Sequence, residues 1–207
     1  MTLDDRLSTL DELWAVWAAH GTSMTDEQWS RPTRLGDWDV LSLFAHHGAW
    51  PFMLGGLLTR VQEREPTHAT AAALLRDFNA PDGVANTRRR DAAESAPADA
   101  ERYGRAAIVE QFTTAGPRAL EAARALGPVV VDYFGHAALR LEEAISIGIM
   151  EATVHLLDLR RALGQEPDVP AAGLAHTAAL LAQMAPPVDL IEAATGRSRV
   201  DVFPVLT

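Results

Sequence analysis

The sequence predicts an all-α protein, a four-helix bundle with long connections and a short C-terminal tail of helical and extended segments. Three observations predict this fold. Apolar residues recur at helical spacing in four long stretches, and capping residues or glycines stand at the ends of those stretches. The one strand-like run, VVVDYF at 129–134, is short and has no evident partner, so we expect an ordered loop there. At 207 residues and 48% hydrophobic content, one core with a small appendage is expected.

The first expected helix begins at residue 3. Thr2 and Asp5 form the pattern of a capping box, and Gly21 is a plausible end. A short helical turn at Thr25–Trp29 repeats the capping pattern. The stripe that would face the core has spacings of four, three, four and three: Leu3, Leu7, Leu10, Trp14 and Trp17.

The second and third long helices each contain a proline. Asp39 can cap a helix from Val40 towards Arg60, and Pro51 predicts a kink within it. The third helix fits Arg105–Leu126 and is interrupted at Pro117. Between these two, a helix is expected near Ala69–Phe78, and the polar residues 81–104 predict a long loop.

The fourth long helix runs from about Leu139 to Leu163, with Gly164 as the residue that follows its end. We therefore predict two parts, a bundle over residues 1–165 and a tail over 166–207 that packs on it. Within the tail, residues 173–184 and 189–194 can be helical, and residues 199–207 are expected to be extended.

Composition excludes several classes of function. The net charge of −10 disfavours nucleic acid and anionic membrane surfaces as partners. The chain has no Cys, which excludes disulfides and a protein thiol nucleophile, and all 18 basic residues are Arg, which excludes lysine chemistry. Acidic residues stand where a signal peptide would be basic, and no apolar run approaches a membrane span, so we expect a cytoplasmic protein.

The candidate chemistry lies on the second and fourth helices. Glu151 and His155 are four residues apart and share a helical face beside apolar positions, where a carboxylate is costly unless it is paired or metal-bound. On the second helix, His46 or His47 can face inward. Two histidines and a glutamate form a ligand set of catalytic zinc sites. The alternative is a weak Glu–His contact on a helix surface and a core or boundary histidine.

Two motifs resemble those of a known family. The first runs from Trp29 through Arg31-Pro32-Thr33 to Trp38 and His46, and the second is Glu151-Ala-Thr-Val-His155 followed by Asp158-Leu159. In order and separation they resemble the mycothiol-dependent maleylpyruvate isomerase family, within the DinB/YfiT-like superfamily of four-helix metalloproteins. The resemblance covers about residues 1–165.

The resemblance implies a divalent metal held by His46, Glu151 and His155. Zinc is favoured, and nickel or iron also suits this ligand set. His47 has no place in the motif and is expected near the ligands or exposed, with a ligand role as the alternative. Asp158 could orient a ligand, although a structural pairing with Arg160 or Arg161 is favoured. The namesake enzyme carries a further C-terminal domain, for which the tail here is too short, so the maleylpyruvate substrate is implied less directly than the metal.

The favoured function is therefore that of an enzyme, an S-transferase or isomerase that uses a mycothiol-like low-molecular-weight thiol on a small electrophile. One alternative is a metal-dependent hydrolase with metal-bound water. The other is a non-catalytic small-molecule-binding or interaction module. Arg88, Arg89 and Arg90 could bind an acidic ligand, and four tryptophans could line an apolar pocket: Trp14, Trp17, Trp38 and Trp50. The sequence is also compatible with a homodimer through an apolar helix face or the tail.

Overall fold

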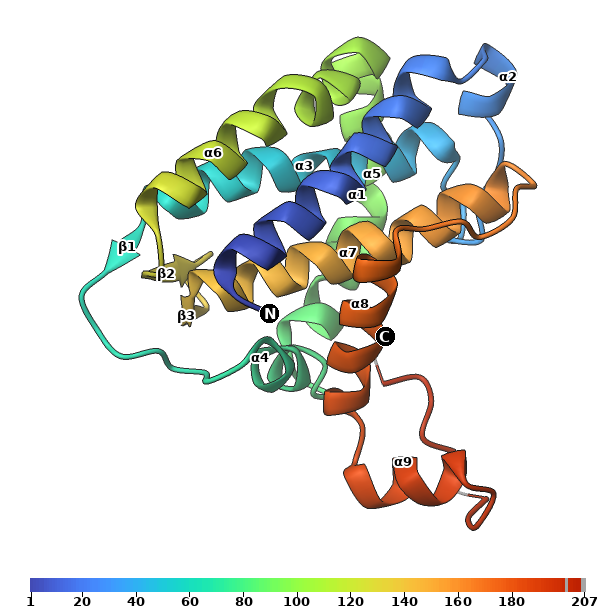
Figure 1. Cartoon of the computed structure of the whole chain (residues 1–207). Coiled ribbons are helices and arrows are strands. Elements are labelled where there is room, and N and C mark those ends of the chain that lie inside the picture. The colour runs from blue at the N-terminus through green and yellow to red at the C-terminus, as the bar shows by residue number, and fades with distance from the viewer. Residues whose placement is uncertain (200, 206–207) are drawn as a thin grey trace.

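The computed structural model describes residues 1–199 and 201–205, without the side chains of residues 89 and 92. It is predominantly helical, as predicted, and its only sheet in that part of the chain is small (Figure 1). The helices are α1 (Leu3–Ser23), α2 (Asp26–Trp29), α3 (Val40–Leu58), α4 (Ala71–Phe78), α5 (Val84–Glu110), η1 (Gln111–Ala115), α6 (Gly116–Leu126), α7 (Leu141–Ala162), α8 (Ala171–Met184) and α9 (Pro187–Ala194); the strands are β1 (Val61–Gln62), β2 (Val130–Tyr133) and β3 (Ala137–Arg140).

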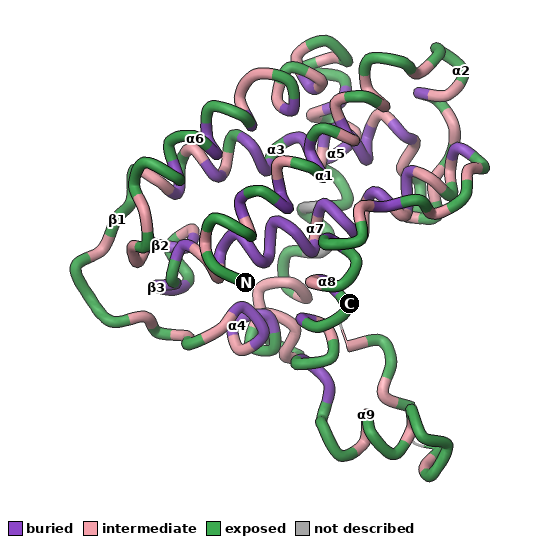
Figure 2. The backbone as a smooth tube through the Cα atoms, in the orientation of Figure 1, coloured by how far each residue is buried: buried purple, intermediate pink, exposed green. Residues whose placement is uncertain are grey.

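The predicted four-helix bundle consists of α1, α3, α7 and the run from the end of α5 through η1 to α6. Buried residues line the facing sides of these helices, while their outer sides are exposed (Figure 2). An aromatic cluster fills the centre: Trp17 lies 4.7 Å from Phe44 and 5.6 Å from Phe112 between ring centroids. These rings come from three different helices, so they hold the bundle together from within.

Three predicted helix ends are confirmed, whereas α1 continues past the predicted end at Gly21 to Ser23. Thr2 and Asp5 form a full capping box at α1, and the Asp39 carboxylate accepts a hydrogen bond from the backbone N–H of Ser42 at the start of α3. Gly164 follows α7 with φ = 68°, a conformation that glycine adopts at no steric cost. Helix α3 continues through Pro51.

The predicted loop at residues 81–104 is wrong, because α5 occupies most of this stretch. Ala96 and Ala100, four residues apart, are buried, so a narrow alanine stripe packs a segment whose remaining surface is polar. Within α5, Gly104 has φ = 70° and ψ = 165°, which breaks the helical path into a long first part and a short second part. A polar helix whose buried face consists of small residues has the composition of a loop, which explains the error.

The third predicted helix is divided differently from expectation. The π-helical segment η1 precedes α6, and Pro117 lies in the first turn of α6. Pro117 has no backbone N–H and cannot donate the usual hydrogen bond to the preceding turn. The wider π-helical turn of η1 ahead of it accommodates this missing donor. A Cβ on Gly116 would lie 2.8 Å from Trp14, so α6 approaches α1 closely at this glycine.

The loop predicted for VVVDYF is also wrong, because most of it forms β2. This strand pairs antiparallel with β3 and, on its other side, with β1. Phe134 and Gly135, with φ of 54° and 79°, reverse the chain between β2 and β3. The partner strand β3 is rich in alanine, a residue typical of helices, so the predicted fourth helix starts within it. In the structure α7 begins at Leu141, two residues later than predicted.

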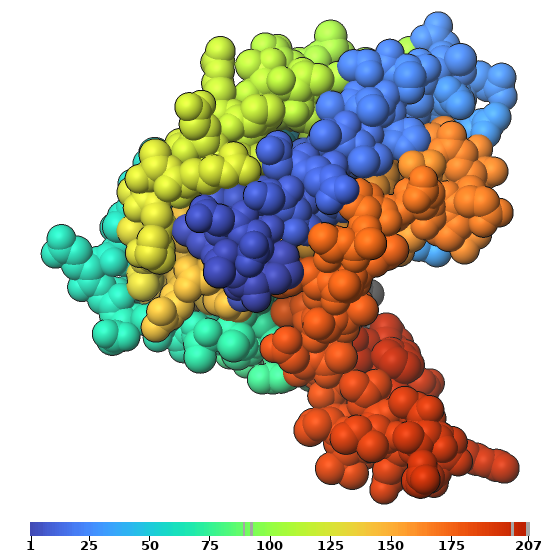
Figure 3. Space-filling view, in the orientation of Figure 1, coloured from blue at the N-terminus to red at the C-terminus, as the bar shows by residue number. Residues whose placement is uncertain are grey.

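The C-terminal segment contains two helices with different surroundings. Helix α8 packs against α7, α4 and α1, and a Cβ on Gly173 would lie 3.0 Å from both Leu13 and Thr153. Helix α9 has no buried residue and projects from the body of the molecule (Figure 3). Residues 201–205 form no regular structure, and 200, 206 and 207 of the predicted extended end lie outside the described residues. No helix in the described part is long and apolar enough to cross a membrane.

Candidate metal centre

Helices α3 and α7 bring three metal-ligating side chains together. One ligand-type atom from each of His46, Glu151 and His155 lies within 4.8 Å of the other two. His46 projects from α3, and the other two project from one face of α7 at a spacing of four residues. The structure therefore places together the three residues that the sequence motifs single out.

The helices that carry these side chains are held by the core. The indole N–H of Trp17 donates to the backbone oxygen of Ala152 at 3.2 Å, which ties α1 to the turn of α7 that carries Glu151 and His155. Ala152 and Leu156 beside the ligands are fully buried. A rigid apolar surround of this kind fixes polar side chains in place.

His155 is held between two carboxylates. Its Nε2 lies 3.4 Å from an oxygen of Glu151, and its Nδ1 lies 3.0 Å from an oxygen of Asp158. The other oxygen of Asp158 accepts a hydrogen bond from Nε of Arg34 at 2.6 Å. The carboxylate of Asp158 thus orients the imidazole so that Nε2 faces Glu151.

This pairing corrects the favoured role of Asp158, which contacts His155 and Arg34 rather than Arg160 or Arg161. Arg34 was not predicted as part of the site. It belongs to the loop before α3 and stands 124 residues before Asp158 in the chain. No spacing rule connects positions so far apart, and only the fold reveals their contact.

The electrostatics of the site favour a protonated His155. Burial by itself lowers the pKa of this imidazole, but its hydrogen bonds to Asp158 and Glu151 outweigh burial and raise the pKa to about 9. Burial raises the pKa of the Glu151 carboxyl, and the bond to His155 more than reverses this, so the net shift is downward. In the metal-free protein the two side chains form an ion pair at neutral pH.

His46 has the opposite protonation state. Burial, and next the positive charge of His155, lower its pKa to about 4, so its ring is neutral at pH 7. Its ring centroid lies 5.1 Å from that of His155, perpendicular to it, and 4.9 Å from that of Trp38. A neutral imidazole keeps a lone pair, which is what a metal ligand requires.

His47 lies in the core and is fully buried, which excludes the exposed position that the sequence allowed. Its ring lies 4.6 Å from Trp17 and 5.5 Å from Phe112, and neither ring nitrogen has a hydrogen-bond partner in the described part of the chain. Burial lowers its pKa well below the usual value. Among the described residues, the potential metal-binding group contains His46 and does not contain His47.

The other candidate residues lie mostly away from this site. Arg88 and Arg90 are exposed on α5, and the side chain of Arg89 lies outside the described residues. Of the four tryptophans, Trp14, Trp17 and Trp50 are buried in the core, and Trp38 contacts His46. The indole N–H of Trp38 donates to the backbone oxygen of Ala93, which links the first half of α5 to the neighbourhood of His46.

The three side chains fit a divalent metal chemically. Two imidazole nitrogens and one carboxylate oxygen are ligands that zinc accepts with a further position left open. With metal–ligand bonds of about 2.0–2.1 Å, tetrahedral ligand atoms lie roughly 3.3–3.4 Å apart. Nε2 of His155 and the carboxylate oxygen of Glu151 are 3.4 Å apart, which matches this separation. All three ligand atoms lie within 4.8 Å of one another, so a small side-chain movement would bring them to such distances.

A comparison with protein families gives one match. The family model described as the mycothiol maleylpyruvate isomerase N-terminal domain matches residues 10–160, which include α3 and most of α7. No curated protein and no solved structure matches the chain. The matched region spans more than half of the sequence and contains His46, Glu151 and His155. The chain therefore belongs to the family of the mycothiol maleylpyruvate isomerase N-terminal domain.

Proposed function

We propose that this protein is a metal-dependent enzyme that uses a mycothiol-like low-molecular-weight thiol as nucleophile or cofactor, in an S-transfer or an isomerisation. One observation carries the proposal: His46, Glu151 and His155 converge within 4.8 Å inside the region that matches a mycothiol-related family. Zinc is our first choice of metal, with nickel and iron as alternatives.

The residues of the site have separate tasks. His46 offers a neutral nitrogen, and Glu151 offers a carboxylate that is already ionised. His155 must release its proton before Nε2 can act as a ligand, and Asp158 then keeps Nδ1–H engaged. A divalent metal at this position would lower the pKa of a bound thiol and so favour the thiolate at neutral pH.

The composition of the chain is compatible with a nucleophile supplied by a separate thiol. It contains neither Cys nor Lys, so a covalent step through a protein thiol or amine is excluded. The substrate class that fits a thiolate is a small electrophile. We place this reaction in the cytoplasm, where low-molecular-weight thiols are kept reduced.

The first test is metal content. Wild type, His155→Ala and the control His136→Ala, which removes an exposed histidine elsewhere, are purified in parallel and measured by inductively coupled plasma mass spectrometry. We expect roughly one divalent metal per chain in wild type and in the control, and little in His155→Ala. A wild-type protein that stays metal-free after incubation with zinc, nickel and iron would overturn both metalloenzyme functions and favour a binding module.

The second test separates the thiol reaction from hydrolysis. The metal-loaded protein is assayed with monobromobimane and other electrophiles, with mycothiol, with glutathione and without a thiol. We expect consumption of the electrophile that requires metal and mycothiol and is lost in His155→Ala. Metal-dependent turnover without any thiol would instead support the hydrolase alternative.

A further inference from the structure

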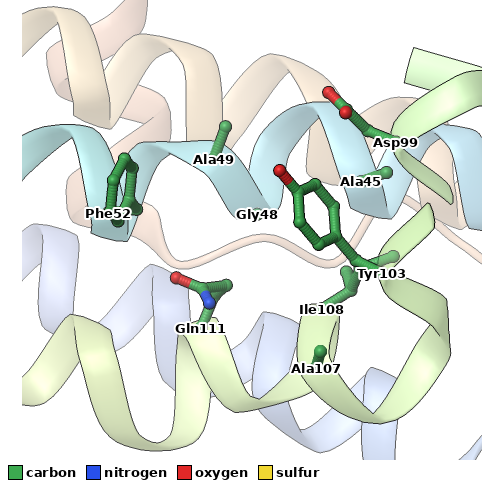
Figure 4. Close-up of a pocket in the computed structure, with 9 residues that line it drawn as sticks. All are labelled: Ala45, Gly48, Ala49, Phe52, Asp99, Tyr103, Ala107, Ile108 and Gln111. Atoms are coloured by element: carbon green, nitrogen blue, oxygen red, sulfur yellow. The ribbon is translucent and has the colours of Figure 1, made fainter. Parts of the chain in front are cut away.

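A hollow of about 350 Å³ lies between α3 and α5, and none of the three candidate ligands lines it (Figure 4). Small-molecule sites typically have volumes of about 300–1,000 Å³, so the hollow can hold a compact organic molecule. No function described above uses it. Its shape and chemistry therefore need an account of their own.

The hollow results from two features of the chain. The side of α3 that faces it carries small residues over little more than one helical turn, at Ala45, Gly48 and Ala49. On the opposite side, α5 changes direction at Gly104, so that Tyr103 before the break and Ala107 after it both line the space. Small side chains and a helix break together prevent the two helices from closing against each other.

Two aromatic side chains border the hollow and remain in contact with solvent. Phe52 on α3 is 75% exposed, and Tyr103 on α5 is 54% exposed. Figure 4 shows the Tyr103 ring reaching from α5 towards α3, while Phe52 stands further along α3. Exposed aromatic faces beside a concave surface are suited to cover a flat apolar group.

The polar side chains of the hollow are those of Asp99, Tyr103 and Gln111. Asp99 contributes a carboxylate. Among the described residues no Arg or His lines the space, and the nearby Arg102 guanidinium lies over the Tyr103 ring, 5.3 Å from its centroid. Gln111 contributes an amide whose Oε1 is shielded from water and has no hydrogen-bond partner in the described part of the chain. A carboxylate at the hollow favours a ligand that donates hydrogen bonds to it.

We propose that this hollow binds a small arylalkylammonium ion, with its aromatic ring between Phe52 and Tyr103 and its ammonium group at Asp99. The net charge of −10 attracts such a cation to the protein. The proposal is independent of the metal centre, because the two sites share no residue.

Three probes with the same ring and different end groups test the ligand class: 2-phenylethylammonium, 2-phenylethanol and 3-phenylpropionate. Binding to the full-length protein is measured by saturation-transfer NMR and by titration calorimetry. We expect the ammonium ion to bind at least roughly tenfold more tightly than the alcohol, and the carboxylate to bind least. Absence of ammonium binding at about 10 mM, or equal binding of the carboxylate, would overturn the proposal.

Variants locate the binding. Ala49→Phe fills the hollow from an exposed position, and Ala122→Phe adds the same ring at an exposed alanine of α6 that does not line it. We expect roughly tenfold weaker ammonium binding in Ala49→Phe and in Asp99→Asn, and no change in Ala122→Phe. His155→Ala should retain the binding, which separates this site from the metal centre. Wild-type affinity in Ala49→Phe, with the fold verified by circular dichroism, would place the binding elsewhere and refute the proposal.

Discussion

His155 is the residue on which the candidate site depends most. Its two nitrogens are engaged by two carboxylates, one on each side of the ring, and the pKa of about 9 shows that a cation is favoured at this position. A metal ion would replace the proton as that cation. The contribution of Asp158 can therefore be tested separately from that of the ligands.

Asp158→Asn should weaken metal binding roughly 10- to 100-fold, because the amide cannot supply the negative charge that stabilises and orients the His155 ring. The pKa of His155 should fall at the same time, since a hydrogen-bonded carboxylate is removed. Competition with a chromophoric chelator measures the affinity, and NMR titration of the imidazole measures the pKa. Asp11→Asn, which removes a surface partner of Arg124, is the control. Equal affinity in both variants would show that Asp158 has only a structural role.

His47 makes the metal-free protein sensitive to acid. Burial keeps the pKa of His47 well below 6.5 in the folded protein. Below pH 6.5 the His47 imidazole is therefore protonated in the unfolded chain but stays neutral in the native state. The free energy of unfolding therefore falls as the pH drops below 6.5. In His47→Leu, this slope should decrease by up to about 1.4 kcal/mol per pH unit.

The slope is measured by urea unfolding of chelator-treated protein at several pH values from 6.5 downward. His136→Leu, at an exposed position, should keep the wild-type slope. An unchanged slope in His47→Leu would mean that acid sensitivity arises at other groups, such as His46.

At the scale of elements, α5 is defined by its break. Gly104 has φ = 70° and ψ = 165°, a region that is essentially restricted to glycine. The part of α5 after Gly104 joins the bundle. The longer part before Gly104 packs against α3, and its Ala93 accepts the hydrogen bond from the Trp38 indole. A continuous helix could not do both.

Gly104→Ala should lower the free energy of unfolding by about 1–3 kcal/mol, because alanine is strained in this backbone conformation. The matched control is Gly56→Ala, a helical glycine of α3 with open space around it, where alanine should stabilise by up to about 1 kcal/mol. Urea unfolding of both variants checks the contrast. If Gly104→Ala is as stable as wild type, the break is not a fixed feature of the fold.

At the scale of the whole molecule, the two tail helices differ in how far they belong to the body. Helix α8 lies against the bundle with Gly173 in close contact, whereas α9 buries none of its residues and leaves Val188 and Ile191 exposed. Apolar burial is the main source of stability, so the two helices should contribute unequally.

Two shortened chains test this and the proposed division after residue 165. A chain that ends at residue 185 should melt within about 2 °C of wild type, because α9 buries no residue and Val205, which also packs on the core, is only partly buried. A chain that ends at residue 165 should keep its helical spectrum but melt more than about 5 °C lower, because Leu13 and Thr153 lose the cover of α8. Thermal unfolding followed by circular dichroism measures both. An equal loss in the two chains would contradict the difference between α8 and α9.

The sequence predicted what local chemistry controls. Thr2 with Asp5, Asp39 and Gly164 mark helix ends because a cap is made by residues within one turn of the helix end. The four-residue step from Glu151 to His155 predicts a shared face for the same reason. The family resemblance is also carried by such short motifs, and the family match agrees with it.

Tertiary structure decided everything that depends on residues far apart in the chain. Strand β2 exists because β1 and β3 supply its hydrogen bonds, and the polar first half of α5 is helical with Ala96 and Ala100 buried. Arg34 meets Asp158 across 124 positions, and the packing of Trp17 and Phe112 places His47 in the core while His46 faces His155. Such contacts gain their free energy only when distant segments pack together, so no local pattern in the sequence can specify them.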